Sequence, residues 1–305
     1  MYCGLAWLPL CTAGIGLATI LITYMLAVAN EHIQPVLPYI SDTGIEYPES
    51  SVFSLCMDIV AFLLVLTVYV SHQLIGQFSC CYGNLDKRYQ ILRRVNGVGL
   101  IVGIIAAGGL IILANFPEDE NLPIHLMGAF FCFTFGVVYC FLHSWLSFKI
   151  SPEFVSPWIC FLRLALATFS ALTLALCILF GGVLRWNANE ENPQPFYKKI
   201  SAVFEWTLVV TLDLYFATFA VEFRRLKMTH TFEHYKEGSW AEFPAIIRRS
   251  GSTSQSEDTA STKSSYLANS NYIINYDVKN ICQHNNGRTH TLPSGEWCIG
   301  WATTV

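Results

Sequence analysis

The stretch SVFSLCMDIVAFLLVLTVYVSHQLI, residues 51–75, determines the fold class. It holds a single carboxylate, Asp58, and no lysine or arginine. A helix needs about 20 mostly apolar residues to cross a bilayer, and a spanning open sheet would leave backbone groups unpaired in hydrocarbon. The stretch therefore predicts a transmembrane helix.

Five runs of the same kind accompany it. The predicted spans are residues 5–30, 51–75, 95–116, 124–148, 158–184 and 200–223. Hydrophobic residues make up 53% of the 305 residues and charged residues 13%, whereas soluble domains carry about a quarter charged residues. We predict an all-α integral membrane bundle of six transmembrane helices in residues 1–227. A mostly disordered cytosolic tail, polar and rich in Ser and Thr, is predicted for residues 228–305.

The first run has an alternative interpretation as a cleaved signal peptide. Ala27-Val28-Ala29 resembles a small-residue cleavage site. However, no Lys or Arg precedes the run, and it is longer than the roughly 7–15 apolar residues of a signal peptide. We therefore favour a retained helix.

Charge alternates between the two sides of the predicted bundle. Residues 80–94, between the second and third spans, hold Lys87, Arg88, Arg93 and Arg94, and the sixth span ends in further basic residues. Residues 31–49 hold acidic side chains and no Lys or Arg. Because Lys and Arg favour cytoplasmic loops, both termini are predicted to be cytosolic. The opposite face, lumenal or extracellular, is predicted to be acidic.

Several polar residues are predicted to gather at the lumenal mouth of the bundle. They are Asp42, Glu49, Asp58, Asn115, His125 and Glu205. Ionisable residues in a membrane are costly and are therefore candidates for function. Two interpretations remain open: a proton-sensitive or small-ligand site facing an acidic lumen, or a hydrogen-bonded network that fixes helix register.

Asp213 is predicted to lie deeper, near the middle of the membrane. At 100° per residue it is roughly 80° around the helix from Glu205, so the two are predicted not to share one stripe. Its candidate partners are Asp58, Ser170 and Thr173.

Other features are assigned to the cytosolic side. His143 and Arg163 are predicted to be interfacial residues that snorkel toward water. Cys80 and Cys81, placed in a basic loop, are candidates for palmitoylation, and that loop for contact with anionic lipids. The ending Thr303-Thr304-Val305 fits a PDZ ligand, with Thr303 and Val305 as its determinants.

Small residues recur in the third span at Gly99, Gly103 and Ala107. This spacing lets two helix backbones approach closely. Packing inside the bundle is the favoured interpretation, and a homo-oligomer seam is the alternative.

Residue patterns of enzymes are lacking. The sequence shows no His-Glu-x-x-His, no Gly-x-Ser-x-Gly and no Gly-rich phosphate loop. We expect no enzymatic activity, no cofactor, no metal site and no nucleic-acid partner. The lipid bilayer is the expected environment, and a channel or channel subunit is one remaining possibility.

Separated motifs give the chain a family resemblance. PYISDTG (38–44), ANF (114–116), His125 and SAVFEW (201–206) together resemble the damage-regulated autophagy modulator (DRAM) family. The wider group includes Sfk-type and TMEM150-type proteins. The resemblance covers about residues 5–227, with the six helices in the same order. DLYFATFAVEF (213–223) is closer to the TMEM150 branch.

The two branches imply different functions. The DRAM resemblance implies a lysosomal or endosomal membrane protein that promotes autophagy. The TMEM150 resemblance implies a plasma-membrane protein, in some relatives an adaptor for phosphoinositide-kinase complexes. Our leading hypothesis is a non-enzymatic endolysosomal modulator of autophagy or lysosomal function, and the plasma-membrane adaptor is the second. The resemblance supplies no catalytic residues.

Overall fold

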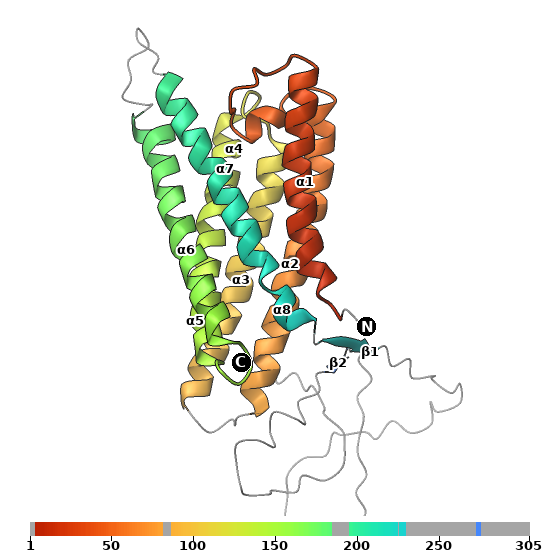
Figure 1. The fold of residues 1–305 in the computed structure, drawn as a ribbon, viewed down its shortest axis with the longest axis vertical. Coiled ribbons are helices and arrows are strands. Elements are labelled where there is room, and N and C mark those ends of the chain that lie inside the picture. The colour runs from red at the N-terminus through yellow and green to blue at the C-terminus, as the bar shows by residue number, and fades with distance from the viewer. Residues whose placement is uncertain (1–3, 82–86, 185–194, 225, 230–272, 276–305) are drawn as a thin grey trace, which may run out of the picture.

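A computed structural model describes residues 4–81, 87–184, 195–224, 226–229 and 273–275. In this part of the chain, six helical rods are long and apolar enough to cross a membrane. They stand side by side as one elongated bundle (Figure 1). The all-α, six-span prediction is confirmed.

Some spans are single helices and others are composite. The first three are α1 (Trp7–Ala29), α2 (Glu49–Cys81) and α3 (Lys87–Asn115). The fourth joins α4 (Leu122–Ala129), the π-helical η2 (Phe130–Thr134) and α5 (Phe135–Lys149). The fifth joins α6 (Pro157–Ile178) to the π-helical η3 (Leu179–Leu184). The sixth is α7 (Pro195–Ala217) followed by α8 (Ala220–Phe223).

Short elements complete the fold. A 3-10 turn, η1 (Ser41–Gly44), lies in the loop between α1 and α2. After the sixth span, β1 (Lys227–Thr229) pairs antiparallel with β2 (Ile273–Asn275), and Met228 faces Ile274. The predicted disorder of the tail concerns residues that lie mostly outside the described ranges.

Local sequence explains where two of the spans begin. Asn121 caps α4, its side chain accepting a bond from the Ile124 amide at 3.4 Å. Pro157 starts α6 directly after Ser156, whose backbone is extended. Proline suits the first turn of a helix because its missing N–H would have no partner there.

The helices around residues 80–94 are longer than predicted. α2 continues to Cys81 and α3 starts at Lys87, so Arg93 and Arg94 lie on helical turns and not in a loop. Hydropathy predicts only the apolar part of each helix. Because Lys, Arg, Gln and Leu also favour helix, α3 begins before its apolar run.

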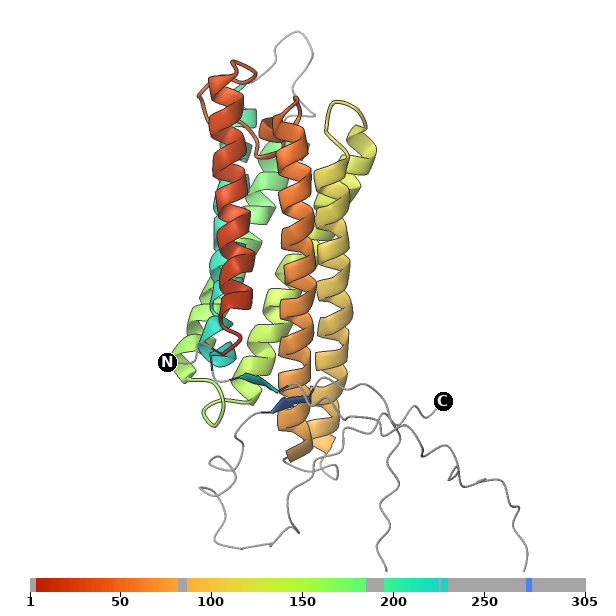
Figure 2. The same ribbon diagram turned by 90° about the vertical axis from the view of Figure 1, so that its right-hand side faces the viewer.

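The first and the last span are neighbours in the bundle. Figure 2 shows α1, α2 and α3 side by side, and in Figure 1 α7 crosses between α1 and α6. The Leu5 amide donates to the Phe223 carbonyl at 2.9 Å. The beginning of the first span and the end of the last therefore meet at one end of the bundle. We call this the basic end, and the opposite end, with loops 30–48 and 116–121, the acidic end.

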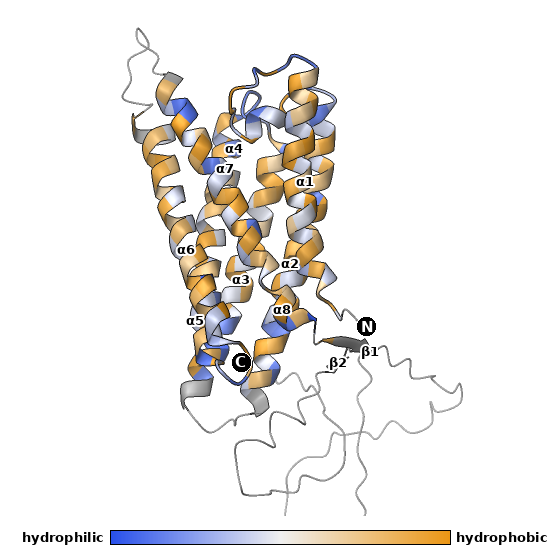
Figure 3. Cartoon of the chain, viewed as in Figure 1, coloured by the Kyte–Doolittle hydropathy of each residue, from blue (hydrophilic) through white to orange (hydrophobic). Residues whose placement is uncertain are grey.

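The outer surface matches a lipid environment. Figure 3 shows hydrophobic residues along the length of the rods, with hydrophilic residues concentrated toward the two ends. Large apolar side chains such as Phe62, Ile101 and Trp158 are exposed. Lipid tails are as apolar as these side chains, so their exposure is consistent with membrane-facing positions.

Glycines set the closest helix contacts. A Cβ added at Gly103 would lie 2.7 Å from Val68 of α2, which fits the favoured interpretation of packing inside the bundle. A Cβ at Gly128 would lie 2.6 Å from the Leu113 amide nitrogen, and one at Gly109 would lie 2.8 Å from Phe131. At Gly99 it would meet nothing within 4 Å. The homo-oligomer seam remains a prediction.

Candidate functional site

The polar residues predicted to gather at the lumenal mouth do lie toward the acidic end, but in separate local contacts. Asp42 pairs with Lys198 at 3.0 Å, and Glu49 contacts Asn30 at 2.6 Å and His32 at 3.2 Å. Asn115 donates to Asp58 at 2.8 Å, and His125 donates to the Phe116 carbonyl at 2.8 Å. Glu205 accepts a bond from the Ile40 amide at 2.9 Å. These contacts do not form one continuous network.

The loop containing PYISDTG is fastened to the sixth span. Besides the bond from Ile40 to Glu205, the Trp206 indole donates to the Pro38 carbonyl at 2.9 Å. On the other side, the hydroxyls of Thr43 and Thr23 of α1 are 3.1 Å apart. Two motifs that carried the family resemblance, 38–44 and 201–206, therefore form one structural unit. We call it the loop clasp.

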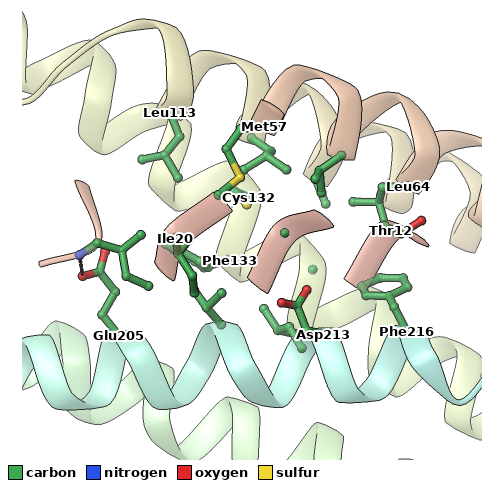
Figure 4. A pocket seen from close by; sticks show the side chains of 18 of the residues that line it. Thr12, Ile20, Met57, Leu64, Leu113, Cys132, Phe133, Glu205, Asp213 and Phe216 are labelled. Carbon is green, nitrogen blue, oxygen red and sulfur yellow. Dashed lines mark hydrogen bonds between the residues drawn. The ribbon is translucent and has the colours of Figure 1, made fainter. Parts of the chain in front are cut away.

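A cavity lies between the loop clasp and the middle of the bundle. Its volume is about 110 Å³, and residues of α1, α2, α3, η2, α5 and α7 line it together with Ile40 and Ser41 at the start of η1. The lining is mainly apolar, with Ile20, Met57 and Leu113 among its residues. Figure 4 shows Glu205 at one end of the cavity and Asp213 further along α7.

The predicted separation of Glu205 and Asp213 is therefore wrong, since both line this cavity. The apolar face of a helix is commonly about 100° wide or more. Two residues that are roughly 80° apart around the helix axis can therefore line the same cavity. The predicted partners Asp58 and Ser170 form no hydrogen bond with Asp213: Asp58 accepts from Asn115, and the Ser170 hydroxyl is itself without a partner among the described residues. Thr173 donates within its own helix, to Phe169 and Ser170 carbonyls.

Asp213 faces the cavity with an unpartnered oxygen. Its Oδ2 atom is buried, and no described residue forms a hydrogen bond with it; the same holds for Glu49 Oε2, Ser170 Oγ and Glu222 Oε1, but these residues do not line the cavity. Across from it stands Gly16 of α1, where an added Cβ would lie 3.5 Å from each carboxyl oxygen. A polar atom buried without a partner is destabilising, so this position calls for a functional explanation.

The basic half of the bundle contains a different arrangement, centred on Arg163 of α6. Its guanidinium lies 2.7 Å from Glu222 of α8. It also donates to Ser147 at 3.0 Å, to the Thr218 hydroxyl at 2.9 Å and to the Thr218 carbonyl at 3.3 Å. The Phe219 ring lies 5.0 Å from the guanidinium carbon. Arg163 joins α5, α6 and the junction of α7 with α8.

A second group of contacts continues this arrangement. His143 lies 3.0 Å from the Ser71 hydroxyl and 3.3 Å from the Tyr215 hydroxyl. Tyr215 donates to the Cys140 carbonyl at 2.7 Å. We call the contacts of Arg163, Glu222, His143 and Tyr215 the basic-half network.

The predicted interfacial role of His143 and Arg163 is wrong. Their exposed fractions are 5% and 1%. Snorkelling requires an open path to water, whereas here partners on neighbouring helices surround both side chains. Glu222 was missed as a partner, although a carboxylate at the cytosolic end of one span and an arginine early in another were a usable signal.

The remaining predicted site residues are not positioned in detail. Cys80 and Cys81 belong to the end of α2, but their side chains lie outside the description, as do Thr303 and Val305. Palmitoylation and PDZ binding stay predictions. Among the described residues, no group of three His, Cys, Asp or Glu side chains has the arrangement of a metal site.

Fold and site define a class: an integral membrane protein with six spans, a loop clasp at one end and a carboxylate-lined cavity within the bundle. The chain belongs to the Frag1/DRAM/Sfk1/Cwh43P family, since the profile of that family's N-terminal domain matches residues 4–226.

Curated relatives agree with this assignment. Human DNA damage-regulated autophagy modulator protein 1 is 32% identical over 74% of this chain and 93% of its own length. The human modulator protein 2 is 29% identical over 74% of this chain and 86% of its own. Modulator of macroautophagy TMEM150B-A of Xenopus laevis is 31% identical over 72% and 88%, respectively. No solved structure matches the chain significantly.

Proposed function

We propose that this protein is a non-enzymatic modulator of autophagy in lysosomal or endosomal membranes. The observation that carries the proposal is the match, across most of their length, to relatives named as modulators of autophagy. The matched region is the transmembrane bundle. The modulating activity is therefore assigned to the bundle and not to the tail.

Orientation follows from the asymmetry of charge. The acidic end, with Asp42 and Glu49, faces the lumen, and the basic end, with Lys149 and Arg224, faces the cytosol. Both termini are then cytosolic. In this proposal, further contacts form on the cytosolic side. They are palmitoylation at Cys80 and Cys81, contact with anionic lipids, and binding of a PDZ partner by the tail.

We place the functional site at the cavity. Of the polar residues predicted to gather at the lumenal mouth, Glu205 is the one that lines it, and Asp213 is the second carboxylate. A pair of carboxylates inside the membrane is costly unless it has a use. The other predicted members, held in local contacts, are assigned to helix and loop positioning.

The second candidate is a plasma-membrane adaptor of a phosphoinositide-kinase complex. It is favoured by the TMEM150-like stretch 213–223 and by the similarity to TMEM150B-A. The two candidates differ in the membrane where the protein resides, so imaging of a tagged chain against lysosomal and plasma-membrane markers separates them.

The test of the proposal uses cells that lack the protein. Autophagic flux is measured as turnover of a lipidated autophagosome marker with and without inhibition of lysosomal proteases. Re-expression should restore flux, and an Asp213→Asn/Glu205→Gln variant of equal abundance should not. An Asp58→Asn variant, altered at a carboxylate outside the cavity, serves as the matched control. Unchanged flux in cells lacking the protein would refute the proposal.

A further inference from the structure

We propose that the cavity binds a short primary alkylammonium ion, with its alkyl chain in the apolar part and the ammonium at Asp213. This ligand class goes beyond the proposed function and does not depend on it.

The cavity is long and narrow. Along α7 its lining runs from Glu205 to Phe216, and along α2 from Phe53 to Leu64. At about 1.5 Å per residue each stretch is roughly 16 Å long. The volume of about 110 Å³ is smaller than the roughly 150 Å³ of a cavity that holds a single benzene. The cavity therefore admits a short, unbranched ligand of about benzene size, and long acyl chains and fused rings are too large.

The lining favours hydrocarbon over water. Most lining residues are aliphatic or aromatic, and the Thr12 hydroxyl is already engaged by the Leu8 carbonyl at 2.9 Å. A buried water needs about two to four polar partners, which this surface does not offer along most of its length. Each methylene group moved from water into such a cavity contributes about 0.8 kcal/mol.

The charged side chains of the lining determine which polar group a ligand can carry. Its described residues include two carboxylates, Glu205 and Asp213, and no Lys, Arg or His. Two cations of the bundle have partners elsewhere, Lys198 at Asp42 and Arg163 at Glu222. No described residue donates to the unpartnered Asp213 oxygen, and we assign that donor to the ligand.

An ammonium group fits this requirement better than the alternatives. It donates charge-assisted hydrogen bonds to a carboxylate and compensates its charge, which a hydroxyl cannot do. Calcium needs six to eight oxygen ligands and magnesium an octahedral set. Besides the two carboxylates, this mainly apolar lining offers few oxygen atoms.

Gly16 leaves the space for the ammonium group. An added Cβ would lie 3.5 Å from both oxygens of Asp213, which is an ordinary contact distance. A serine therefore fits without displacing backbone. Its hydroxyl would extend toward the carboxylate and supply, from within the protein, the hydrogen bond that the ligand is proposed to make.

The experiment uses the full-length chain in nanodiscs of phosphatidylcholine. The probe is n-butylamine with a photoreactive diazirine in its chain, and labelled peptides are mapped by mass spectrometry. Labelling is expected on α1 and α7 beside the cavity. Unlabelled n-butylamine should compete at a concentration roughly tenfold lower than n-butanol, because the alcohol lacks the charge. Butanoic acid should compete least.

Two variants and a control make the result specific. Asp213→Asn should reduce labelling at the cavity roughly tenfold, and Gly16→Ser should reduce it while keeping the carboxylate. Asp58→Asn should label like the wild type, because that carboxylate does not line the cavity. Circular dichroism and size-exclusion profiles confirm folding of each variant.

Several outcomes would overturn the proposal. Equal competition by n-butanol would show a site for alkyl chains without selection of the ammonium. Undiminished labelling in Gly16→Ser would remove Asp213 from the site, even if Asp213→Asn fails to fold. Labelling confined to the outer surface would show ordinary partition into the bilayer. Since the assay uses purified protein, its result is independent of the autophagy measurements.

Discussion

The two halves of the bundle place carboxylates of the same span in different surroundings. In the basic half, Oε2 of Glu222 meets the buried guanidinium of Arg163 at 2.7 Å, while its Oε1 atom has no hydrogen-bond partner among the described residues. In the acidic half, Asp213 faces a cavity, and its Oδ2 atom has no partner among the described residues. An intramembrane carboxylate thus has two distinct roles: it connects helices where a cation of a neighbouring helix reaches it, and it is a binding candidate where space is left open.

Packing explains why the larger space lies in the acidic half, whereas a cavity of only about 10 Å³ lies beside His143. Around Arg163, aromatic rings fill the interior: Phe219 packs edge-on against His143 and stacks on Phe223. Near Asp213 the lining includes Gly16 and Gly136. Glycines on the surrounding helices leave volume that large side chains occupy in the basic half.

The largest expected effect comes from breaking the basic-half network. Arg163→Met removes the cation and leaves Glu222 buried without compensation. Breaking a buried ion pair in this way costs about 3–5 kcal/mol, so the variant should unfold at a lower temperature in detergent and accumulate poorly in cells. Thermal unfolding followed by tryptophan fluorescence measures the loss.

A double variant shows whether charge is the cause. Arg163→Met with Glu222→Met replaces the pair by apolar side chains, and such replacements are often neutral. Most of the lost stability should return. If the double variant were as unstable as Arg163→Met alone, the contacts to Ser147 and Thr218 would be responsible instead.

The acidic half should be most sensitive to changes of backbone packing. A Cβ at Gly109 would lie 2.8 Å from both the Phe131 carbonyl carbon and its Cβ. Gly109→Ala should therefore force α3 away from η2 and lower the free energy of unfolding by about 1–3 kcal/mol. The measurement is the same thermal unfolding assay.

The neighbouring glycine provides the matched control. A Cβ at Gly108 would meet nothing within 4 Å, and alanine is favoured over glycine in a helix by about 1 kcal/mol. Gly108→Ala should be neutral or slightly stabilising. If both variants lost the same amount of stability, the glycines would be needed for flexibility of the helix and not for close packing with η2.

The sequence predicted the transmembrane helices, because each depends on a long run of apolar residues. It did not predict contacts between single residues that are far apart in the chain. Hydropathy located six spans, and the spacing of Gly103 indicated a close helix contact. The partner of Arg163 lies 59 residues away, so no local pattern connects them, and only the placement of both charges near the cytosolic ends of their spans indicated the pair. The cavity depends on side chains of several elements together, so Glu205 and Asp213 were assigned to different faces although both line it.

The smallest effect is expected at Asp58 and Asn115, which were predicted to belong to a polar cluster. The Asn115 side chain is exposed and Asp58 is only partly buried, although their side chains are 2.8 Å apart. Asp58→Asn should change the free energy of unfolding by no more than about 0.5 kcal/mol, as is usual at surface positions. Combining it with His125→Ala should give additive changes, because the two residues have separate partners. A coupling free energy between the two substitutions well above about 0.5 kcal/mol would contradict the difference described between the two halves of the bundle. The acidic end would then act as one connected network like that of the basic half, and the cavity carboxylates would have to be treated as part of it.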